Sequence, residues 1–178
     1  TLALYLPPLS STLPSTLQLP RPCAPNAVAA GDFNGDLHDD IAAIAPLSGT
    51  IQIWLAAASQ ITPTAMATLA YPTGGYDALG VGDMDNDGDD DLVALRGAGY
   101  LTSAVVIYWQ DAGHFPISST LTPAHGGYLP HGLAVGDVNG DGLDDIVVTA
   151  GGNAPDAYLN VFLQQTNRRL TQINANPI

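Results

Sequence analysis

A nine-residue stretch reads Asp83-Met-Asp-Asn-Asp-Gly-Asp-Asp-Asp91, and the chain repeats its pattern twice more. The other copies read Asp32-Phe-Asn-Gly-Asp-Leu-His-Asp-Asp40 and Asp137-Val-Asn-Gly-Asp-Gly-Leu-Asp-Asp145. In chain order we call the copies loop 1, loop 2 and loop 3, and we number their positions 1 to 9. Every copy has an oxygen-bearing side chain at positions 1, 3, 5 and 9. Alternating side chains on a tightly curled loop can converge on one point, so the pattern predicts three clusters of oxygen atoms.

These clusters have the chemistry of a calcium site. Carboxylates held close together repel one another, and a bound cation removes that repulsion. Ca²⁺ prefers oxygen ligands and accepts a flexible ligand set, so it fits the pattern better than softer metals. We therefore expect three Ca²⁺ ions, bound by the side chains of Asp32, Asn34, Asp36 and Asp40, of Asp83, Asp85, Asp87 and Asp91, and of Asp137, Asn139, Asp141 and Asp145.

The charge of the chain is concentrated in these loops. All 17 acidic residues are Asp, and 14 of them lie in the three loops, so the formal net charge of -13 belongs to the sites more than to the general surface. There is no Lys and only four Arg, which leaves no basic patch to neutralise phosphates and argues against nucleic-acid binding. No apolar run approaches the ~20 residues that span a bilayer, so we expect no membrane span.

The loops belong to a larger repeat. They begin at residues 32, 83 and 137, a spacing of 51 and then 54 residues. A short apolar run precedes each loop, another follows it, and two further strand-like runs complete each unit. Helix signals are nearly absent, and 19 Gly with 14 Pro punctuate the chain. A period of this length with four short strands predicts the blades of a propeller.

The fold class that follows is all-β: three four-stranded antiparallel propeller-type blades with Ca²⁺-binding loops, preceded by an extended N-terminal arm. We assign the arm to residues 1–25 and the blades to residues 26–72, 73–124 and 125–178, with 26–178 as one repeat domain. Trp54, Tyr108 and Phe162 fall at one position of the third strand in each blade. Aromatic residues repeated at one structural position predict core between blades, and a sugar-stacking surface is the alternative.

The pattern Gly-Asp-x-(Asp/Asn)-x-Asp-Gly-x-x-Asp-(Leu/Ile) between two apolar strands resembles the FG-GAP/VCBS repeat. That repeat builds the β-propeller of integrin α subunits and of many bacterial surface proteins. The resemblance covers residues 26–178. It implies that each loop joins the first two strands of its blade and that position 7 adds a backbone carbonyl to the calcium ligands. Carried over, those carbonyls belong to His38, Asp89 and Leu143.

Two features bear on how well the sites bind. Loop 1 has Leu37 at position 6, where the other loops have Gly88 and Gly142, and a β-carbon is costly there if φ is positive. Loop 2 offers four carboxylates where the other loops offer three. Because more ligand charge gives tighter binding, we expect site 2 to be the tightest and site 1 the weakest.

Propellers of this family usually have about seven blades, so three blades indicate a fragment, or copies that assemble into a ring or a filament.

Two other classes fit the residues less well. An EF-hand needs a Glu at loop position 12 and flanking helices, whereas position 12 here is Ala43, Ala94 or Val148 and the flanks are strands. The chain has no nucleophile elbow, phosphate-binding loop or Cys-x-x-Cys pair, and the metal loops use most of its acids. We therefore do not expect an enzyme.

We predict a secreted calcium-binding repeat protein with a structural or adhesive role. Weak Ca²⁺ sites fill outside the cell, and the chain begins at Thr1, as it would after removal of a signal peptide. In the first interpretation, copies self-assemble into a surface structure or filament because the arm donates its apolar Thr1–Leu6 strand to a neighbour, and the alternative is a strand paired within its own chain. In the second, the chain is a lectin-like or adhesion module that binds a glycan or a protein, or an accessory domain of a larger extracellular protein.

Overall fold

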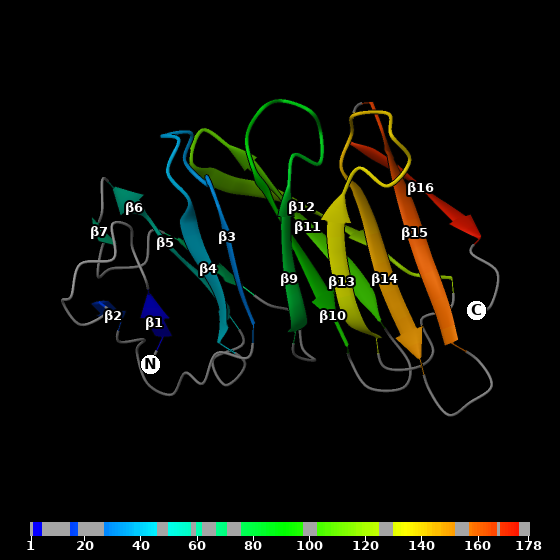
Figure 1. Ribbon diagram of the computed structural model, residues 1–178, viewed down its shortest axis with the longest axis horizontal. Coiled ribbons are helices and arrows are strands. Elements are labelled where there is room, and N and C mark those ends of the chain that lie inside the picture. The colour runs from blue at the N-terminus through cyan, green and yellow to red at the C-terminus, as the bar shows by residue number, and fades with distance from the viewer. Residues whose placement is uncertain are drawn as a thin grey trace.

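Three four-stranded antiparallel sheets make up most of the computed structural model (Figure 1). We call them blade 1, blade 2 and blade 3 in chain order. They confirm the expected all-β class with four strands in each repeat. The part of the chain that the structure describes contains no helix, and hence none that could cross a membrane. That part comprises residues 2–4, 15–17, 27–45, 50–57, 60–61, 67–70, 76–97, 103–124, 130–151, 157–166 and 168–174.

Within each blade the strands follow chain order, and each pairs antiparallel with the next. Blade 1 contains β3 (Val28–Gly31), β4 (Asp40–Ala45), β5 (Thr50–Trp54) and β8 (Ala67–Ala70). Blade 2 contains β9 (Tyr76–Gly82), β10 (Asp91–Arg96), β11 (Ala104–Asp111) and β12 (His114–Leu121). Blade 3 contains β13 (Pro130–Gly136), β14 (Asp145–Gly151), β15 (Ala157–Gln165) and β16 (Arg169–Asn174). In every blade the acidic loop joins the first strand to the second, as the family resemblance implies.

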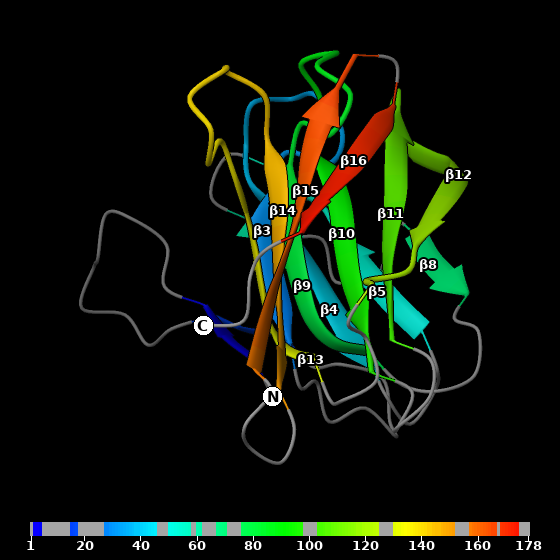
Figure 2. The ribbon, with the colours of Figure 1, turned by 90° about the vertical axis from the view of Figure 1, so that its right-hand side faces the viewer.

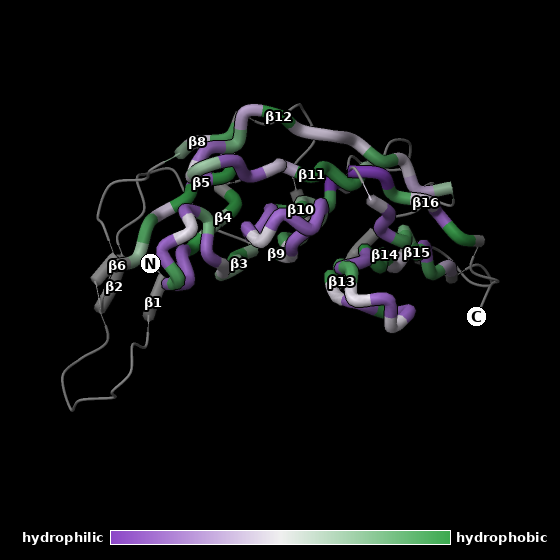
Figure 3. Tube along the Cα trace, turned by 90° about the horizontal axis from the view of Figure 1, so that it is seen from above, coloured by the Kyte–Doolittle hydropathy of each residue, from purple (hydrophilic) through white to green (hydrophobic). Residues whose placement is uncertain are grey.

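The blades fan out along an arc when seen from above (Figure 3). The first strands, β3, β9 and β13, lie on the inner side of the arc, and the fourth strands, β8, β12 and β16, lie on the outer side. Strand β9 contacts both β3 and β13. Sheets arranged in this way are the blades of a propeller around its axis. The three acidic loops lie at the same end of the sheets (Figures 1 and 2).

Burial along the strands follows from this stacking. The middle strands of blade 2 are covered on both faces, so β10 is an unbroken apolar run whose residues Leu92–Leu95 are fully buried. The outer strand β12 has a neighbouring strand on one side alone and is mostly exposed. In blade 2 the middle strands therefore read as apolar runs, whereas the outer strand carries polar residues.

Two hydrophobic cores lie between neighbouring blades. The first, between blades 1 and 2, includes Phe33, Ile53 and Tyr108. The second, between blades 2 and 3, includes Met84, Trp109 and Phe162. The three aromatic residues predicted as core, Trp54, Tyr108 and Phe162, are all buried. Tyr108 and Phe162 pack between blades, as predicted, whereas Trp54 lies on the face of blade 1 that points away from blade 2, opposite to Ile53.

The described residues near the N-terminus do not form an extended arm. Strand β1 (Leu2–Leu4) pairs antiparallel with β2 (Ser15–Leu17) in a separate two-stranded sheet. A second small sheet, formed by β6 (Ala56–Ala57) and β7 (Gln60–Ile61), is an addition to the predicted blade 1. Both small sheets lie at the blade 1 end of the arc (Figure 1). The rest of residues 1–25 falls outside the described part of the chain.

Candidate metal centre

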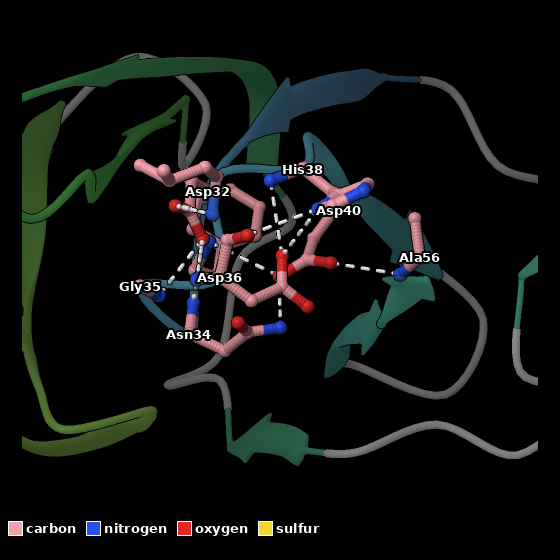
Figure 4. A network of polar contacts seen from close by, with 9 residues as sticks. Asp32, Asn34, Gly35, Asp36, His38, Asp40 and Ala56 are labelled. Carbon is pink, nitrogen blue, oxygen red and sulfur yellow. Dashed lines mark hydrogen bonds and ion pairs between the residues drawn. The ribbon is translucent and has the colours of Figure 1, made fainter. Parts of the chain in front are cut away.

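Position 1 of each loop is an aspartate whose carboxylate accepts hydrogen bonds from the loop backbone. In all three loops the amides of positions 5 and 6 donate to it, at distances from 2.7 to 3.2 Å. In loop 3 these hydrogen bonds, with that from Gly142 foremost, hold the pKa of Asp137 below its usual value. Figure 4 shows the same arrangement around Asp32 in loop 1. The loops are therefore curled around a carboxylate, as the alternating pattern predicts.

The curl requires a left-handed backbone at two positions of each loop. In loop 1, φ is 75° at Gly35 and 67° at Leu37, which are positions 4 and 6. The corresponding φ values in the other loops are 61° at Asn86, 95° at Gly88, 82° at Gly140 and 85° at Gly142. The backbone at position 6 has the positive φ that makes a β-carbon costly, so the condition for the expected cost of Leu37 is met. Position 4 has the same requirement, which Gly and Asn meet more easily than other residues.

We expect Leu37→Gly to stabilise the protein. The Leu37 side chain is 92% exposed, so its removal loses little packing, while the strain of a β-carbon at positive φ disappears. The free energy of unfolding should rise by about 0.5–1 kcal/mol, the strain relieved less the entropy cost of glycine. Thermal melts in calcium measure this, with Asn86→Gly as control, since Asn tolerates the left-handed region. A lower melting temperature for Leu37→Gly would contradict the strain.

Positions 5 and 7 also have the same geometry in every loop. The amide of position 7 donates to the carboxylate of position 5 at 3.0 Å in loops 1, 2 and 3. In loop 1 the ring nitrogen Nδ1 of His38 lies 2.9 Å from the backbone oxygen of Asp36, and this hydrogen bond is the main reason why the pKa of His38 is raised. The three loops thus follow one backbone path despite their different sequences.

Position 9 is a fully buried aspartate that joins the loop to the third strand of its blade. One carboxylate oxygen accepts the amide of position 2, at 3.1 Å for Asp40, 3.0 Å for Asp91 and 3.2 Å for Asp145. The other oxygen accepts an amide at or just beyond the third strand. These donors are Ala56, Gln110 and Gln164, at 2.8, 2.7 and 2.8 Å. The predicted ligand at position 9 therefore also satisfies two backbone amides.

Loop 2 brings three carboxylates together. Oxygen atoms of Asp83, Asp85 and Asp91 all lie within 4.8 Å of one another and could hold a metal ion. The Asp85 side chain is 7% exposed, and its Oδ1 atom is buried without a hydrogen-bond partner. A buried carboxylate oxygen without a partner is unfavourable unless a cation is bound to it. Both the all-oxygen donor set and the unpaired Oδ1 atom therefore fit Ca²⁺.

Arg168 reaches loop 2 from the neighbouring blade. Its Nε atom donates to Asp85 Oδ2 in an ion pair, and its guanidinium lies over the ring of Trp109, 5.2 Å from the ring centroid. Burial raises the pKa of Asp85, and the hydrogen bond from Arg168 opposes this rise. A protein cation thus already neutralises part of the loop with the most carboxylates. This weakens the expectation that loop 2 binds calcium most tightly.

We expect Arg168→Gln to tighten calcium binding at loop 2. The substitution removes a positive charge that pairs with a predicted ligand, and the gain should be roughly tenfold in Kd, because one charge near a partly exposed site is worth about 1–2 kcal/mol. Isothermal titration calorimetry measures it. Arg169→Gln is the matched control, since it makes the same charge change at an exposed neighbour with no described ion pair. Weaker binding in Arg168→Gln would instead mean that Arg168 orders Asp85 for the metal.

We expect the stability of the calcium-free protein to fall as pH rises from about 4 to about 7. Burial raises the pKa of Asp91 from 3.8 to about 7, so over this range the folded protein holds a proton that the unfolded chain releases. The lowered pKa of Asp137 changes stability only below about pH 4, outside this range, where the unfolded chain takes up that proton first. Calcium-free protein should therefore melt several degrees higher at pH 5 than at pH 7.5. In saturating calcium the order should reverse, because Asp91 must ionise to bind. A calcium-free protein that melts lower at pH 5 would overturn this.

The structure gathers part of the predicted ligand set. Among the described residues, the three aspartates of loop 2 form the one group of three or more potential His, Cys, Asp or Glu ligands, and Asp87 and the aspartates of loops 1 and 3 are not in it. Sequence reasoning assigned no role to position 8, which is Asp39, Asp90 or Asp144, or to Arg168. A signal for position 8 was present, because all three loops have Asp there. No local pattern indicated the contact between Arg168 and Asp85, because the two residues are 83 positions apart.

The sheets and loops define a repeat protein of propeller-type blades with one acidic loop in each blade. A sequence model of the FG-GAP-like repeat matches residues 32–94 and 83–148, which together span more than half of the chain. The chain therefore belongs to the FG-GAP-like repeat family. The repeats of this family are typical of extracellular proteins and often bind Ca²⁺, and the family is generally non-enzymatic. A search of curated proteins found no match.

Proposed function

We propose that this chain is a secreted, calcium-binding FG-GAP-like repeat protein with a structural or adhesive role, and that copies of it self-assemble at a cell surface or into a filament. The observation that carries the calcium proposal is the buried, unpaired Oδ1 atom of Asp85 within the group formed with Asp83 and Asp91. The shared backbone path of the three loops extends the proposal from one site to three.

The residues that would hold the three ions are those predicted from the sequence. Side chains at positions 1, 3, 5 and 9 would contribute oxygen atoms, and position 7 would contribute its backbone carbonyl. Calcium supplies a hard divalent charge that offsets the repulsion between the carboxylates. Residues of the chain position the ligands. Backbone amides orient the carboxylates of positions 1 and 5, and the buried aspartate of position 9 joins the loop to the third strand. Metal binding would thus stabilise the fold of each blade.

A structural role fits this arrangement better than catalysis. The carboxylates of positions 1, 5 and 9 accept backbone amides in every loop, and the described blades pack apolar residues into two cores between them. Extracellular calcium fills sites with Kd values of about 10⁻⁴–10⁻³ M, which suits a module whose stability depends on the ion. The family and its usual location support secretion.

Self-assembly is supported by exposed apolar residues on the two end blades of the described part, Val28 on blade 1 and Val138 on blade 3. The sequence interpretation assigned the joint between copies to residues 1–25. The pairing of β1 with β2 supports the alternative that was left open, a strand paired within its own chain. The proposed homo-oligomer therefore needs a joint elsewhere or in the part of residues 1–25 that is not described.

Sedimentation velocity and electron microscopy with and without calcium test the proposed function. We expect oligomers or filaments in calcium that dissociate when the ion is removed. A protein that binds calcium yet stays monomeric at the highest soluble concentration would contradict self-assembly. If such a monomer bound defined sugars on a glycan array, the adhesion-module interpretation would replace it.

A further inference from the structure

Each of the two contacts between blades contains an equivalent hydrogen bond at the start of an acidic loop. The amide of Asp32 donates to Asp90 Oδ2 at 2.8 Å, and the amide of Asp83 donates to Asp144 Oδ2 at 3.1 Å. In both cases the donor is position 1 of one loop and the acceptor is position 8 of the next loop along the chain. The recurring aspartate at position 8 therefore links each blade to the blade before it.

The residue before each loop permits this approach. A β-carbon added at Gly31 would collide with Val81 and would lie 2.8 Å from Asp90 Oδ2. One added at Gly82 would lie 2.6 Å from both Val135 Cγ1 and Asp144 Oδ2. Real β-carbons essentially never come so close to other heavy atoms, so a side chain at either position would require the facing valine and aspartate to move. The contact is thus built from a glycine and an amide on one blade, and from an aliphatic side chain and an aspartate on the next.

Blade 3 presents the first half of this contact, and no described residue packs against it. A β-carbon at Gly136, the equivalent of Gly31 and Gly82, would meet nothing within 4 Å. Among the described residues no acceptor lies at the amide of Asp137. Val138 at position 2 is 56% exposed, although its equivalents Phe33 and Met84 are fully buried in the two cores. The free face of blade 3 therefore has the donor, the glycine and the apolar surface of an inter-blade contact.

Blade 1 presents the second half at the other end of the arc (Figure 3). Asp39, at position 8, is exposed, whereas Asp90 and Asp144 are half-buried by the contacts they make. Val28 is 50% exposed, although its equivalents Leu79 and Leu133 pack onto the two cores. Farther across the same face of blade 1, Ile41 and Trp54 are buried. On the inner side of this face the exposed residues lie on β3 and the adjoining loop, which is the part that would meet a glycine and an amide.

We propose that these two surfaces form a head-to-tail joint between copies of this chain. In this joint the Asp39 carboxylate of one copy accepts the Asp137 amide of the next, and Ala30 lies over Gly136 as Val81 and Val135 lie over Gly31 and Gly82. Val28 packs against the apolar surface that includes Val138. The joint repeats the contacts already made at Asp90 and Asp144, and it rests on the proposed self-assembly while assigning it to a defined surface. Its two halves differ, so the assembly is a ring if the rotation closes and a filament if it does not.

Two single substitutions block one half each. Val138→Asp and Val28→Asp place a charge on an exposed apolar residue of the joint, and each should weaken assembly at least about a hundredfold, because an unpaired buried charge is strongly unfavourable at an interface. Ile117→Asp is the matched control: Ile117 is 55% exposed but lies on the outer strand β12, so this variant should assemble like the wild type. Asp39→Ala should also weaken assembly, and Asp39→Asn, which keeps an oxygen acceptor, should restore part of it.

Mixing the two blocked variants tests the head-to-tail arrangement. Each alone should be monomeric by sedimentation velocity, and an equimolar mixture should form a discrete dimer, because one intact half remains on each partner. A mixture that stays monomeric, or a Val28→Asp variant that assembles like the wild type, would overturn the joint. Calorimetric calcium binding and circular dichroism of each variant show that the loops and blades are intact. If the wild type assembles and neither variant weakens assembly, the proposed function stands and this joint is wrong. A wild type that is monomeric would contradict both the proposed self-assembly and the joint.

Discussion

Removal of calcium is expected to lower the melting temperature of this protein by about 15–30 °C. At a calcium concentration of about 100 times Kd, each site stabilises the folded state by about 2.7 kcal/mol, so three sites contribute roughly 8 kcal/mol. For a chain of this size 1 kcal/mol corresponds to about 2–4 °C. The physical origin is the repulsion among the 14 aspartates of the three loops, which calcium offsets. Differential scanning calorimetry in excess calcium and after chelation measures the shift.

The effect must be reversible and specific to the ion. Adding calcium back in excess of the chelator should restore the original melt, and the same chelator already saturated with calcium is the control. Melting curves that overlay with and without calcium would show that the loop carboxylates are stabilised by backbone amides alone. Position 1 accepts at least two amides in every loop, and these hydrogen bonds would then be sufficient.

The second large effect is expected for Asp145→Ala in loop 3. Asp145 is fully buried, and its two oxygen atoms accept the amides of Val138 and Gln164. Truncation leaves both amides without an acceptor, which should cost roughly 2–6 kcal/mol even without calcium. The exposed Asp141 is a predicted ligand in the same loop, and Asp141→Ala should cost about 1 kcal/mol or less without calcium.

Chemical unfolding in chelator and in calcium separates the two roles of these aspartates. In chelator, Asp145→Ala should be much less stable than the wild type and Asp141→Ala nearly as stable. In calcium, both should lose the stabilisation that site 3 provides. Equal stability of the two variants in chelator would show that the position 9 hydrogen bonds contribute little, and that position 9 serves the metal alone.

Much of this fold could be predicted because its signals are local and repeated. A spacing of 51 and 54 residues with two apolar runs around each acidic loop left few alternatives to four-stranded blades. The condition for the expected cost of Leu37, a positive φ, is also met for a local reason. Its glycine equivalents in the other loops indicated a left-handed backbone, and φ at Leu37 is 67°.

The remaining features depend on contacts between distant residues. The double hydrogen bonding of Asp91 involves Gln110, whose amide is brought there by the packing of β11 against β10. The ion pair between Arg168 and Asp85 joins residues of different blades, so no spacing in the sequence indicates it. The N-terminal segment carried an apolar strand signal that fits either a donated or an internal strand. Local pattern could not choose between these, because strand pairing depends on what lies beside the strand.

The aspartate at position 8 shows what repetition could have revealed. It is present in all three loops, and the ligand pattern does not use it, so its recurrence indicated a separate role. The structure places Asp90 and Asp144 against the amides of the preceding loops. A residue that recurs in every repeat without serving its own repeat is a candidate for the contact between repeats.

The most direct test of calcium binding in all three loops is a crystal structure of the protein grown with calcium, with anomalous difference maps to locate the ions. We expect three peaks, one in each loop, with oxygen atoms of positions 1, 3, 5, 7 and 9 about 2.3–2.6 Å from each ion. At loop 2 the unpaired Oδ1 atom of Asp85 should be among the ligands. Extracellular calcium sites have Kd values up to roughly 10⁻³ M, so crystals grown well above that concentration should have every site filled. Loops without anomalous density in such crystals would contradict the proposed calcium sites.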